Sequence, residues 1–563
     1  MYPPTIARDH PDADAYVMAG SGESLTYGQL DAASNQLAHH WRTRGVGPGD
    51  SVVIAMENNL AWPVAVAAGM RSGLYVTPVN WHLKPAELAA LLAEARPRAV
   101  VTSATLADDV VEALRLAGLG DAGGSDVDVT VVGGSASGHM SMADALQRQP
   151  TTPIADERLG ARVLYSGGTT GRPKRFAQQL LDVHPAQAPQ RHSGLVQKLG
   201  IDESTVLLSP APNYHAAPFT FGLITLAAGG TVICMERFDA RAAMDAITRY
   251  GVTHSQWVPT MLIRLLRLSD RDDVELSETH RTAFTSGAPC PPEVKEQLAQ
   301  WWGPILHEYY GASEGYGHTY IGPDEAVSHP GSVGRPLGAT RISIVDDDGH
   351  EVPEGERGRV CFEQTTPSAY DNAGPRPARR QMGDIGYLRD GYLYLVGRAG
   401  HMIISGGVNI YPEEVEEVVL SHPDVLDGAV LGVPDPEFGE SVKAVVQRTP
   451  GSTLTAQELI DFCRDRLAHY KTPRVVDFVD ELPRLPTASS TRRRSPTPTA
   501  RRQPPKEKRY DNDDRHDSIG TAARSGGEGS CVRRSALGDD RPRRRRADRG
   551  DHRGARRRSR APP

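Results

Sequence analysis

Apolar positions recur along the chain with two spacings, one typical of strands and one typical of helices. Short apolar runs at residues 51–56, 75–80 and 98–103 predict buried strands, and stretches with helical periodicity at 61–73 and 85–95 predict the helices between them. Strands that alternate with helices in this way indicate βαβ units. The pattern therefore predicts an α/β fold built on doubly wound sheets.

Two local signals add detail. Thr26, followed three residues later by Gln29, forms a capping box and predicts the start of a helix that ends near Gly45. The stretch 119–139 is rich in Gly, Ser and Asp and is expected to be a surface loop.

The alternation continues to about residue 330 and then changes. Short alternating strands with Asp-Gly turns, at 341–352, 358–364 and 391–398, indicate a small antiparallel β-barrel that closes the large domain. A small α+β domain follows. Its expected elements are helices at 412–422 and 455–470 and strands at 428–434, 441–448 and 475–479.

Composition narrows the class of protein. A chain of 563 residues, 39% of them hydrophobic, is long enough for several domains with a substantial core. No apolar run approaches the ~20 residues that cross a bilayer, and the N-terminus, with Pro3, Pro4 and Asp9, lacks a signal-peptide core. We therefore expect a cytoplasmic protein. The five cysteines form no CxxC motif, so the sequence predicts neither a disulfide framework nor a zinc site.

One loop combines groups that suit a phosphate. The sequence YSGGTTGRPKR at 165–175 contains hydroxyls, glycines and a lysine. Glycines allow backbone N–H groups to close around an anion, hydroxyls donate to phosphate oxygens, and lysine neutralises charge. The loop is not a Walker A motif, because Arg172 and Pro173 separate Gly171 from Lys174. Taken alone, a flexible surface linker is the alternative.

This loop is the first of seven motifs that occur in a fixed order. In that order the motifs resemble those of the adenylate-forming superfamily, and within it the acyl-CoA synthetases of the fatty-acid or aryl-acid kind. The resemblance covers about residues 10–487. The other six motifs are PNYHAAP (212–218), SGAPCP (286–291), YYGASEG (309–315), GSVGRP (331–336), MGDIGY (382–387) and GRAGHMIISGGVNIYPEEVE (397–416).

The resemblance implies a reaction in two steps. A carboxylate attacks the α-phosphorus of ATP to give acyl-AMP and pyrophosphate, and the thiol of coenzyme A then displaces AMP to give a thioester. ATP, magnesium and coenzyme A are therefore expected, with a small-molecule carboxylic acid as the substrate and a fatty acid as the favoured one. Because a carboxylate must approach a triphosphate, the site needs cations and preorganised donors. No nucleic-acid partner is expected, and the oligomeric state stays open, with a homodimer as one option.

The resemblance also implies catalytic residues. Thr169 and Lys174 would hold the β- and γ-phosphates, Glu314 would ligate magnesium as a hard oxygen donor, and His215 would lie near the carboxylate. A hydrogen-bonded histidine in a turn is the alternative for His215. Phe219 and Trp257 would line the acyl pocket. Trp257 would lie at its floor, where the bulky indole would shorten the pocket.

A larger set would bind the nucleotide. Tyr310 would lie on the adenine, Ser313 would touch the α-phosphate, and Asp384 would accept both ribose hydroxyls with support from Arg398. Considered one at a time, Tyr310 would more often be a core aromatic and Asp384 a solvated acid; the order of the motifs favours the functional interpretation. The predicted nucleotide-binding residues are Ser166, Gly167, Gly168, Thr169, Thr170, Gly171, Lys174, Gly287, Ala288, Tyr310, Gly311, Ser313, Asp384 and Arg398.

The chain departs from the family pattern at the expected hinge and after the phosphate loop. Gly400 stands where the family has Asp or Lys, so rotation of the small domain is still permitted but the charge that steadies each state is missing. Arg175 replaces a glycine after Lys174. The segment before Asp384 is also short.

A larger departure occurs at the C-terminus. The family carries a catalytic lysine after an LPRxPxG segment, and here the expected Gly-Lys falls on Ala488 and Ser489. Loss of one preorganised donor of this kind costs about 2.7–4 kcal/mol, so adenylation should be impaired. A frameshift explains the change, because one added G before codon 488 permits the reading Gly-Lys-Leu-Tyr and because the composition beyond it is that of GC-rich DNA read out of frame.

The tail allows a competing interpretation. Residues 488–563 are strongly basic although the net charge of the whole chain is −7, and they contain no Phe or Trp. Such a tail cannot bury enough apolar surface to offset its ordering entropy, so we expect disorder. A genuine basic tail for nucleic acid or an anionic surface is the alternative to a frameshift.

These observations predict four segments. They are a large AMP-binding domain at 1–396, a hinge at 397–401, a small mobile domain at 402–487 and the arginine-rich tail at 488–563. The predicted activity is an ATP-dependent acid:CoA ligase. An adenylating enzyme that loads a carrier protein and a degenerate nucleotide-binding protein without activity are the alternatives.

Overall fold

The computed structural model describes most of the chain up to residue 482. Within the described part no helix is both long and apolar enough to cross a membrane; the cytoplasmic location stays a prediction. All described residues belong to one compact unit, Met1–Arg493, and the boundaries at 396, 401 and 487 stay predictions. The described ranges are 2–120, 127–136, 138–166, 174–188, 192–274, 277–288, 290–311, 315–364, 379–399, 402–405, 408–435, 439–467 and 469–482.

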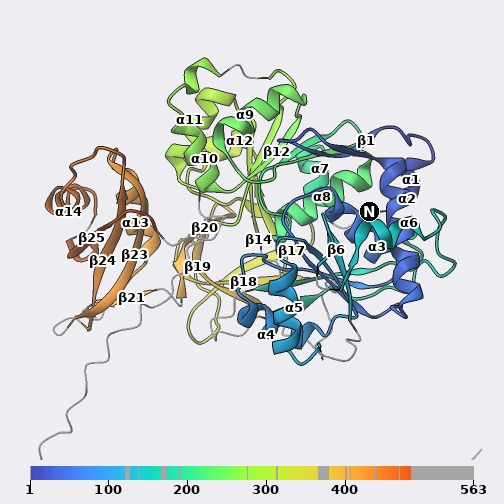
Figure 1. Cartoon of the computed structure of the whole chain (residues 1–563). Helices are drawn as coiled ribbons and strands as arrows, with labels where there is room; N and C mark the ends of the chain where they lie inside the picture. Colours follow the sequence, from blue (N-terminus) through green and yellow to red (C-terminus); the bar gives the residue numbers. More distant parts are fainter. Residues whose placement is uncertain are drawn as a thin grey trace, which may run out of the picture. The chain divides into compact units, whose positions relative to one another are not determined.

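The N-terminal region forms a seven-stranded sheet with helices on both faces (Figure 1). Alternate residues of β3 (Ser51–Ala55) point to opposite faces, so Val52 and Ile54 pack with α2 (Tyr27–Thr43) and α3 (Ala61–Arg71), whereas Val53 and Ala55 pack with α4 (Pro85–Ala95) and α5 (Ala107–Leu116). This confirms the predicted doubly wound arrangement. The strand order is β7 (Met140–Ser141), β6 (Asp128–Val132), β5 (Ala99–Ser103), β3, β4 (Tyr75–Pro78), β8 (Ala161–Ser166) and β9 (Lys174–Ala177), all parallel except β9.

The expectation of a surface loop at 119–139 was wrong in its second half. Residues 128–132 form β6, which pairs with β5 inside the sheet. Val127, Val129 and Val131 are buried against α4 and α5. The strand is short and its flanks are rich in Gly, Ser and Asp, which hid it in the composition of the segment.

A nine-stranded sheet follows, with one large cluster of helices. Helices α9 (Ala240–Arg249), α10 (Pro259–Leu266) and α11 (Pro292–Trp302) share a core with one face of this sheet and lie together in Figure 1. Its order is β16 (Arg335–Pro336), β15 (His318–Ile321), β14 (Leu306–Gly311), β13 (Thr282–Thr285), β12 (His254–Trp257), β10 (Val206–Ser209), β11 (Thr231–Cys234), β1 (Asp14–Met18) and β2 (Ser24–Thr26).

Helix α8 (Ala216–Ala228) joins the cores of the two sheets. Phe219 packs on Trp62 of α3 in the core that covers the first sheet, whereas Phe221 packs with Phe284 and Tyr309 of the second sheet. The two aromatic rings are two residues apart and therefore leave the helix on different sides. Helix α8 is thus fixed between both sheets.

The strands beyond residue 340 form an antiparallel sheet in the order β17 (Thr340–Val345), β18 (Gly358–Gln364), β19 (Arg380–Arg389) and β20 (Tyr392–Arg398). The sequence predicted a small barrel here; in the described residues β17 and β20 are the two edges of this sheet and do not pair with each other.

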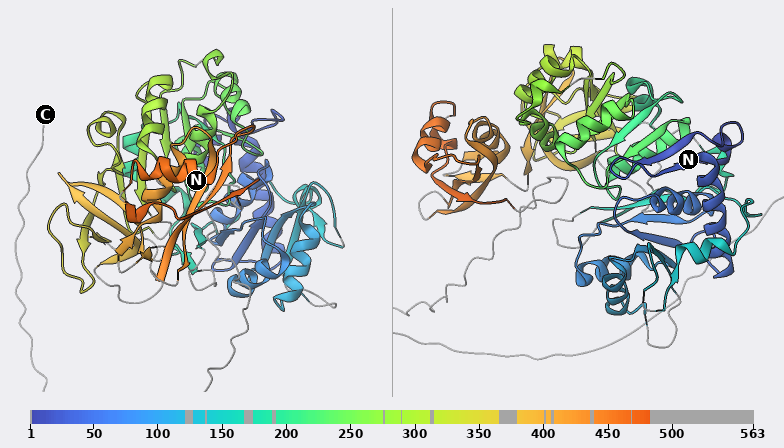
Figure 2. Two further views of the ribbon diagram at one scale, coloured as in Figure 1. Left: turned by 90° about the vertical axis from the view of Figure 1, so that its left-hand side faces the viewer. Right: turned by 45° about the horizontal axis from the view of Figure 1, so that its top comes forward.

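The small C-terminal region is a five-stranded sheet covered by two helices (Figure 2). Val415 and Val419 of α13 (Pro412–Leu420) pack with Leu459 of α14 (Ala456–Arg464) and with the valines of the central strands. The strands are β21 (Ile403–Ser405), β22 (Val408–Ile410), β23 (Val425–Asp435), β24 (Gly439–Arg448) and β25 (Val475–Val479). Three short helices elsewhere are α1 (Pro4–Ala7), α6 (Met142–Gln147) and α7 (Ser193–Leu199), and α12 (Pro323–Ser328) follows β15.

Candidate active site

The predicted phosphate loop connects two paired strands. Ser166 ends β8 and Lys174 begins β9, and the two residues are direct partners in the antiparallel register. The backbone therefore brings the two ends of the loop together at the carboxyl end of β8, where nucleotides bind in open α/β sheets. The rest of the loop, Gly167, Gly168, Thr169, Thr170 and Gly171, lies outside the described residues, as do Ser313, Glu314 and Gly400.

Three predicted nucleotide-binding residues meet in the structure. The Tyr310 hydroxyl donates to Asp384 Oδ2 at 2.6 Å, and Arg398 Nε donates to Asp384 Oδ1 at 2.8 Å. Asp384 is 7% exposed, whereas more than half of the Arg398 side chain is open to solvent. The structure thus gathers an aromatic ring, a carboxylate and a cation in one hydrogen-bonded group.

The local backbone explains this grouping. Asp384 and Arg398 are register partners in the β19–β20 pair, beside a bulge at Ile385 and Gly386. A bulge redirects side chains near functional sites. Gly383, with φ +85°, occupies the left-handed region that glycine tolerates, immediately before the carboxylate.

Gly311 continues β14 beyond Tyr310 and is held close to β15. A Cβ atom at Gly311 would lie 2.6 Å from His318 Cδ2 and 2.8 Å from the Gly317 carbonyl oxygen. The position therefore requires glycine.

The predicted adenine loop follows the neighbouring strand. β13 and β14 are parallel, with Thr285 opposite Glu308, so Gly287, Ala288 and Tyr310 all lie near the carboxyl ends of adjacent strands. Gly287 and Ala288 are exposed. Exposed small residues beside Tyr310 fit the predicted contact with adenine.

His215 precedes the first residue of α8 and its ring lies 4.1 Å from that of Tyr214. Burial, with a smaller contribution from His82, lowers the pKa of His215 to about 4, so the imidazole is neutral near pH 7. Among the described residues no group hydrogen-bonds its buried Nε2 atom. A buried ring nitrogen of this kind suits a hydrogen bond to a ligand, which favours the substrate interpretation over that of a satisfied turn histidine.

The two predicted pocket residues lie in different cores. Phe219 packs on Trp62, whereas Trp257 packs between Phe238 and Trp302 and donates its indole N–H to Ser255 Oγ at 2.6 Å. Phe219 thus lies with α8 and His215, and the structure does not bring Trp257 to them. The role of Trp257 as a pocket floor stays a prediction.

The sequence analysis missed two charged groups near these elements. Arg162 of β8 is buried and contacts α8, and Lys295 forms a buried ion pair with Glu308, two residues before Tyr310. Arg162 stands in the strand directly before the phosphate loop. A charge inside an apolar strand was the signal that could have marked it.

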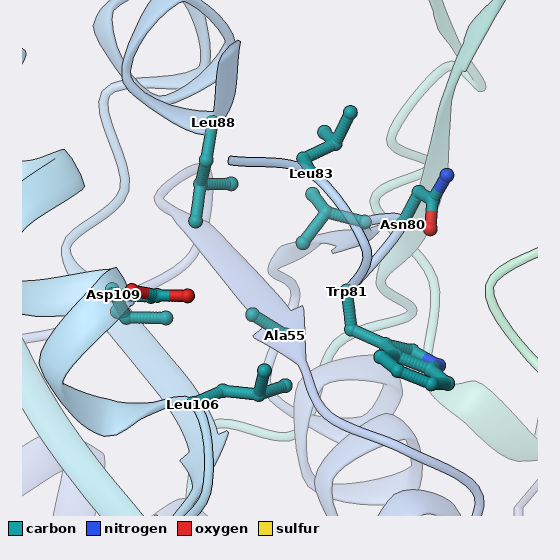
Figure 3. Close-up of a pocket in the computed structure, with 9 residues that line it drawn as sticks. Ala55, Asn80, Trp81, Leu83, Leu88, Leu106 and Asp109 are labelled. Carbon is teal, nitrogen blue, oxygen red and sulfur yellow. The ribbon is translucent and has the colours of Figure 1, made fainter. Parts of the chain in front are cut away.

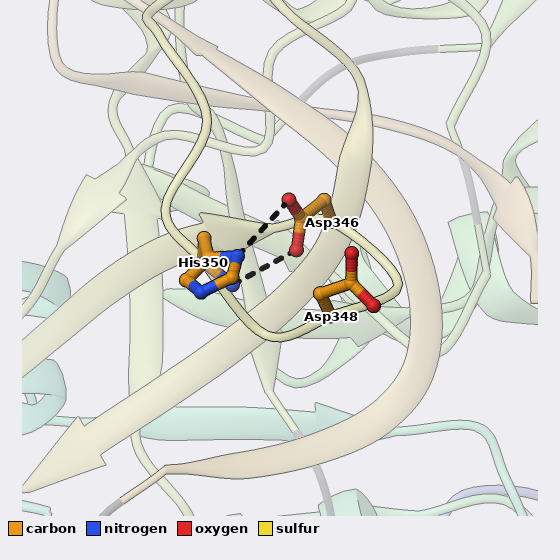
Figure 4. A group of neighbouring side chains, drawn as sticks. All are labelled: Asp346, Asp348 and His350. Carbon is orange, nitrogen blue, oxygen red and sulfur yellow. Dashed lines mark hydrogen bonds and ion pairs between the residues drawn. The ribbon is translucent and has the colours of Figure 1, made fainter.

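An acidic turn and a small cavity in the described part of the chain do not form candidate sites. Asp346, Asp348 and His350 lie close together in the exposed turn after β17, where His350 pairs with Asp346 at 3.6 Å (Figure 4). Aspartates in a hydrogen-bonded turn are common without a metal. A small cavity between Ala55, Trp81, Leu88 and Leu106, with Asp109 at its side, has about 10 Å³ of room (Figure 3), which is at most one water molecule.

Comparisons with known proteins identify the family of this chain. The AMP-binding enzyme profile matches residues 5–367, and that of the AMP-binding enzyme C-terminal domain matches residues 414–490. Sulfoacetate–CoA ligase of Cupriavidus necator is 30% identical over 499 residues, covering 86% of this chain and 95% of that protein. Long-chain-fatty-acid–CoA ligase FadD13 of Mycobacterium tuberculosis is 29% identical over 493 residues, covering 85% and 93%. The structure of Bacillus subtilis o-succinylbenzoate coenzyme A synthetase with ATP and magnesium ion has a TM-score of 0.72 at 26% identity, covering 87% and 97%.

The chain therefore belongs to the AMP-binding enzyme family of adenylate-forming proteins. Within it, the chain is an AMP-forming acyl- or aryl-CoA synthetase that acts on a small-molecule carboxylic acid. ATP and magnesium are its cofactors, and coenzyme A is its co-substrate. These findings confirm the predicted family, fold class, enzyme class and cofactors.

Proposed function

We propose that Tyr310, Asp384 and Arg398 hold the adenosine of ATP and of acyl-AMP in this enzyme. The observation that carries the proposal is the contact of both Asp384 oxygens with donors from Tyr310 and Arg398. Ribose hydroxyls are donors of the same kind and would use the same carboxylate. Gly287, Ala288 and Gly311 would leave room for the base.

The phosphates would lie over the loop between β8 and β9. Ser166, Thr169, Thr170 and Lys174 would bind them, and Glu314 would ligate magnesium, which neutralises charge on the triphosphate. Neutral His215 would direct its Nε2 atom toward the acid. Gly400 would act as the hinge of the small domain.

The acid itself has two candidates. A fatty acid is supported by the motif resemblance and by the similarity to FadD13. An acid with a second anionic group is supported by the similarity to sulfoacetate–CoA ligase and by a buried arginine in β8.

Ser489 stands where the family has its catalytic lysine, and this favours a chain that adenylates poorly. The match to the C-terminal domain ends at residue 490, which agrees with a change of reading frame there. An independent DNA read across codons 480–500 tests the frameshift. An extra G in that read, before codon 488, supports the frameshift, and a read that confirms the present frame overturns it.

The two half-reactions can be assayed apart. With supplied acyl-AMP and coenzyme A, we expect the chain to form thioester, since that step does not use the missing lysine. Thioester formation with a carrier protein but not with coenzyme A would mean that the carrier protein is the acceptor. ATP binding without either half-reaction would support a nucleotide-binding protein instead of an enzyme.

A further inference from the structure

Arg162 places a cation against the helix that would form the wall of the acyl pocket. It lies in β8 and is only 5% exposed. Its Nη1 atom donates to the hydroxyl of Thr220, and its guanidinium carbon lies 5.6 Å from the centre of the Phe219 ring. Both contacts are with α8, four and five residues beyond His215. The cation of β8 therefore packs against the helix whose N-cap residue, His215, would meet the carboxylate.

Two titratable groups of the second sheet, Tyr309 and His318, interact electrostatically with Arg162, and both are neutral. Burial raises the pKa of the Tyr309 phenol to about 12, and burial together with Arg162 lowers the pKa of His318 to about 4. At neutral pH neither carries a charge. An anion that reached this wall would meet a cation, a neutral imidazole and a phenol, all of which favour it over an alkyl group.

The position of Arg162 separates it from the phosphates. It lies four residues before Ser166 along β8, which corresponds to about 13 Å between backbone positions. The phosphate loop begins only after Ser166. The group that Arg162 would meet in addition to its contacts with α8 is therefore the distal end of the acid and not a phosphate.

The space behind Phe219 is small. A cavity lined by Tyr16, Trp62, Asn213, Phe219 and Leu223 has about 20 Å³ of room. That volume holds a water-sized group. An alkyl chain directed past Phe219 into this cavity has no room unless the ring moves, so the wall fits a short acid better than a long one.

We propose that Arg162 is a specificity-determining residue that binds a second anionic group, a carboxylate or a sulfonate, at the distal end of a short acid. The inference rests on the proposed function and chooses between its two candidate acids. The distal charge of the acid, rather than an alkyl tail, would then decide which acids the enzyme binds.

Binding of unreactive acyl-AMP mimics tests this without the missing lysine. We would measure, by calorimetry, the binding of the N-acylsulfamoyl adenosines of succinate and of its neutral terminal amide, together with ATP. The unaltered chain should bind the succinyl compound about tenfold or more tightly than the amide. Arg162→Met should abolish this preference, and Arg162→Lys should keep part of it.

The matched control is Arg158→Met, which removes an exposed arginine that pairs with Asp182 just before β8. It should keep the full preference. Circular dichroism checks that the variants fold. If Arg162→Met does not fold, the preference for the succinyl compound is compared between Arg162→Lys and the unaltered chain. Equal binding of the two compounds by the unaltered chain, with ATP bound, overturns the inference alone. A preference that persists in a folded Arg162→Met overturns the role of Arg162. Absence of binding of ATP and of both compounds overturns the proposed function as well.

Discussion

The Tyr310 hydroxyl donates to Asp384 Oδ2 at 2.6 Å across 74 residues of sequence. The ring that would face adenine and the carboxylate that would bind ribose are thus one hydrogen-bonded unit. Arg398 completes it from the register partner of Asp384. The proposed adenosine site would therefore be set by the pairing of β19 with β20 and by the end of β14.

Asp384→Ala should weaken ATP binding by about tenfold to a hundredfold, because hydrogen bonds to a charged acceptor contribute about 1.5–3 kcal/mol. Tyr310→Phe keeps the ring and should cost less than about tenfold. Calorimetric titration with ATP measures both. Asp348→Ala, in an exposed turn, is the control and should bind as the unaltered chain does. Unchanged affinity in Asp384→Ala would remove this residue from the site.

Gly311→Ala should lower both stability and ATP affinity. The new Cβ would lie 2.6 Å from His318 Cδ2, and overpacking of this kind costs about 1–3 kcal/mol. Thermal unfolding with and without ATP measures the two effects. Gly47→Ala meets no atom within 4 Å and should change neither. If Gly311→Ala were as stable as Gly47→Ala, β15 would have to lie farther from β14 than described.

Lys295→Met should destabilise the large region by about 3–5 kcal/mol, because it leaves the Glu308 carboxylate buried without its cation. Replacing both residues, as Lys295→Met with Glu308→Leu, should recover part of this loss. Urea unfolding followed by tryptophan fluorescence measures it. Lys198→Met, at an exposed helical position, is the control and should change stability by less than about 0.5 kcal/mol. A Lys295→Met chain as stable as that control would contradict the buried pair.

Stability should fall as the pH is lowered from about 6.5 toward 4. Burial and the nearby His254 lower the pKa of His280 to about 4, so over this range the unfolded chain binds a proton at His280 that the folded chain does not. The Ser255 hydroxyl, which accepts from Trp257, lies 2.7 Å from His280 Nε2 and fits a neutral ring. This histidine contributes at most about 3 kcal/mol.

Unfolding midpoints of the unaltered chain and of His280→Gln, measured between pH 7 and pH 5, check this origin. The variant should lose less stability on acidification. Equal losses in the two chains would assign the pH dependence to other groups.

Much of the fold follows from local patterns. The helix at 85–95 and the strands at 358–364 and 475–479 were predicted with the bounds that the structure has. Their apolar positions recur with helix or strand periodicity, and turn residues flank them. The strand at 128–132 was missed because Gly, Ser and Asp dominate the residues on both sides of it.

The site was less accessible to sequence reasoning. The resemblance assigned Tyr310, Asp384 and Arg398 to one nucleotide and Arg398 to the support of Asp384, but it gave no contact between Tyr310 and Asp384, which lie 74 residues apart in the sequence. Arg162 was missed altogether. Its meaning depends on the packing of α8 between two sheets, which no local pattern encodes.

The most direct test is acid-dependent pyrophosphate release from ATP, measured with a panel of mono- and dicarboxylic acids for the chain with Ser489→Lys and for the same chain with Asp384→Ala. We expect pyrophosphate release by the Ser489→Lys chain to require an acid. Its rate should exceed that of the unaltered chain by about 10²–10³, which is the contribution of one preorganised donor. Most of this release should be lost in the chain that also carries Asp384→Ala. Pyrophosphate release that depends neither on the acid nor on Asp384 would contradict the account. So would the absence of pyrophosphate release in a folded chain that binds ATP.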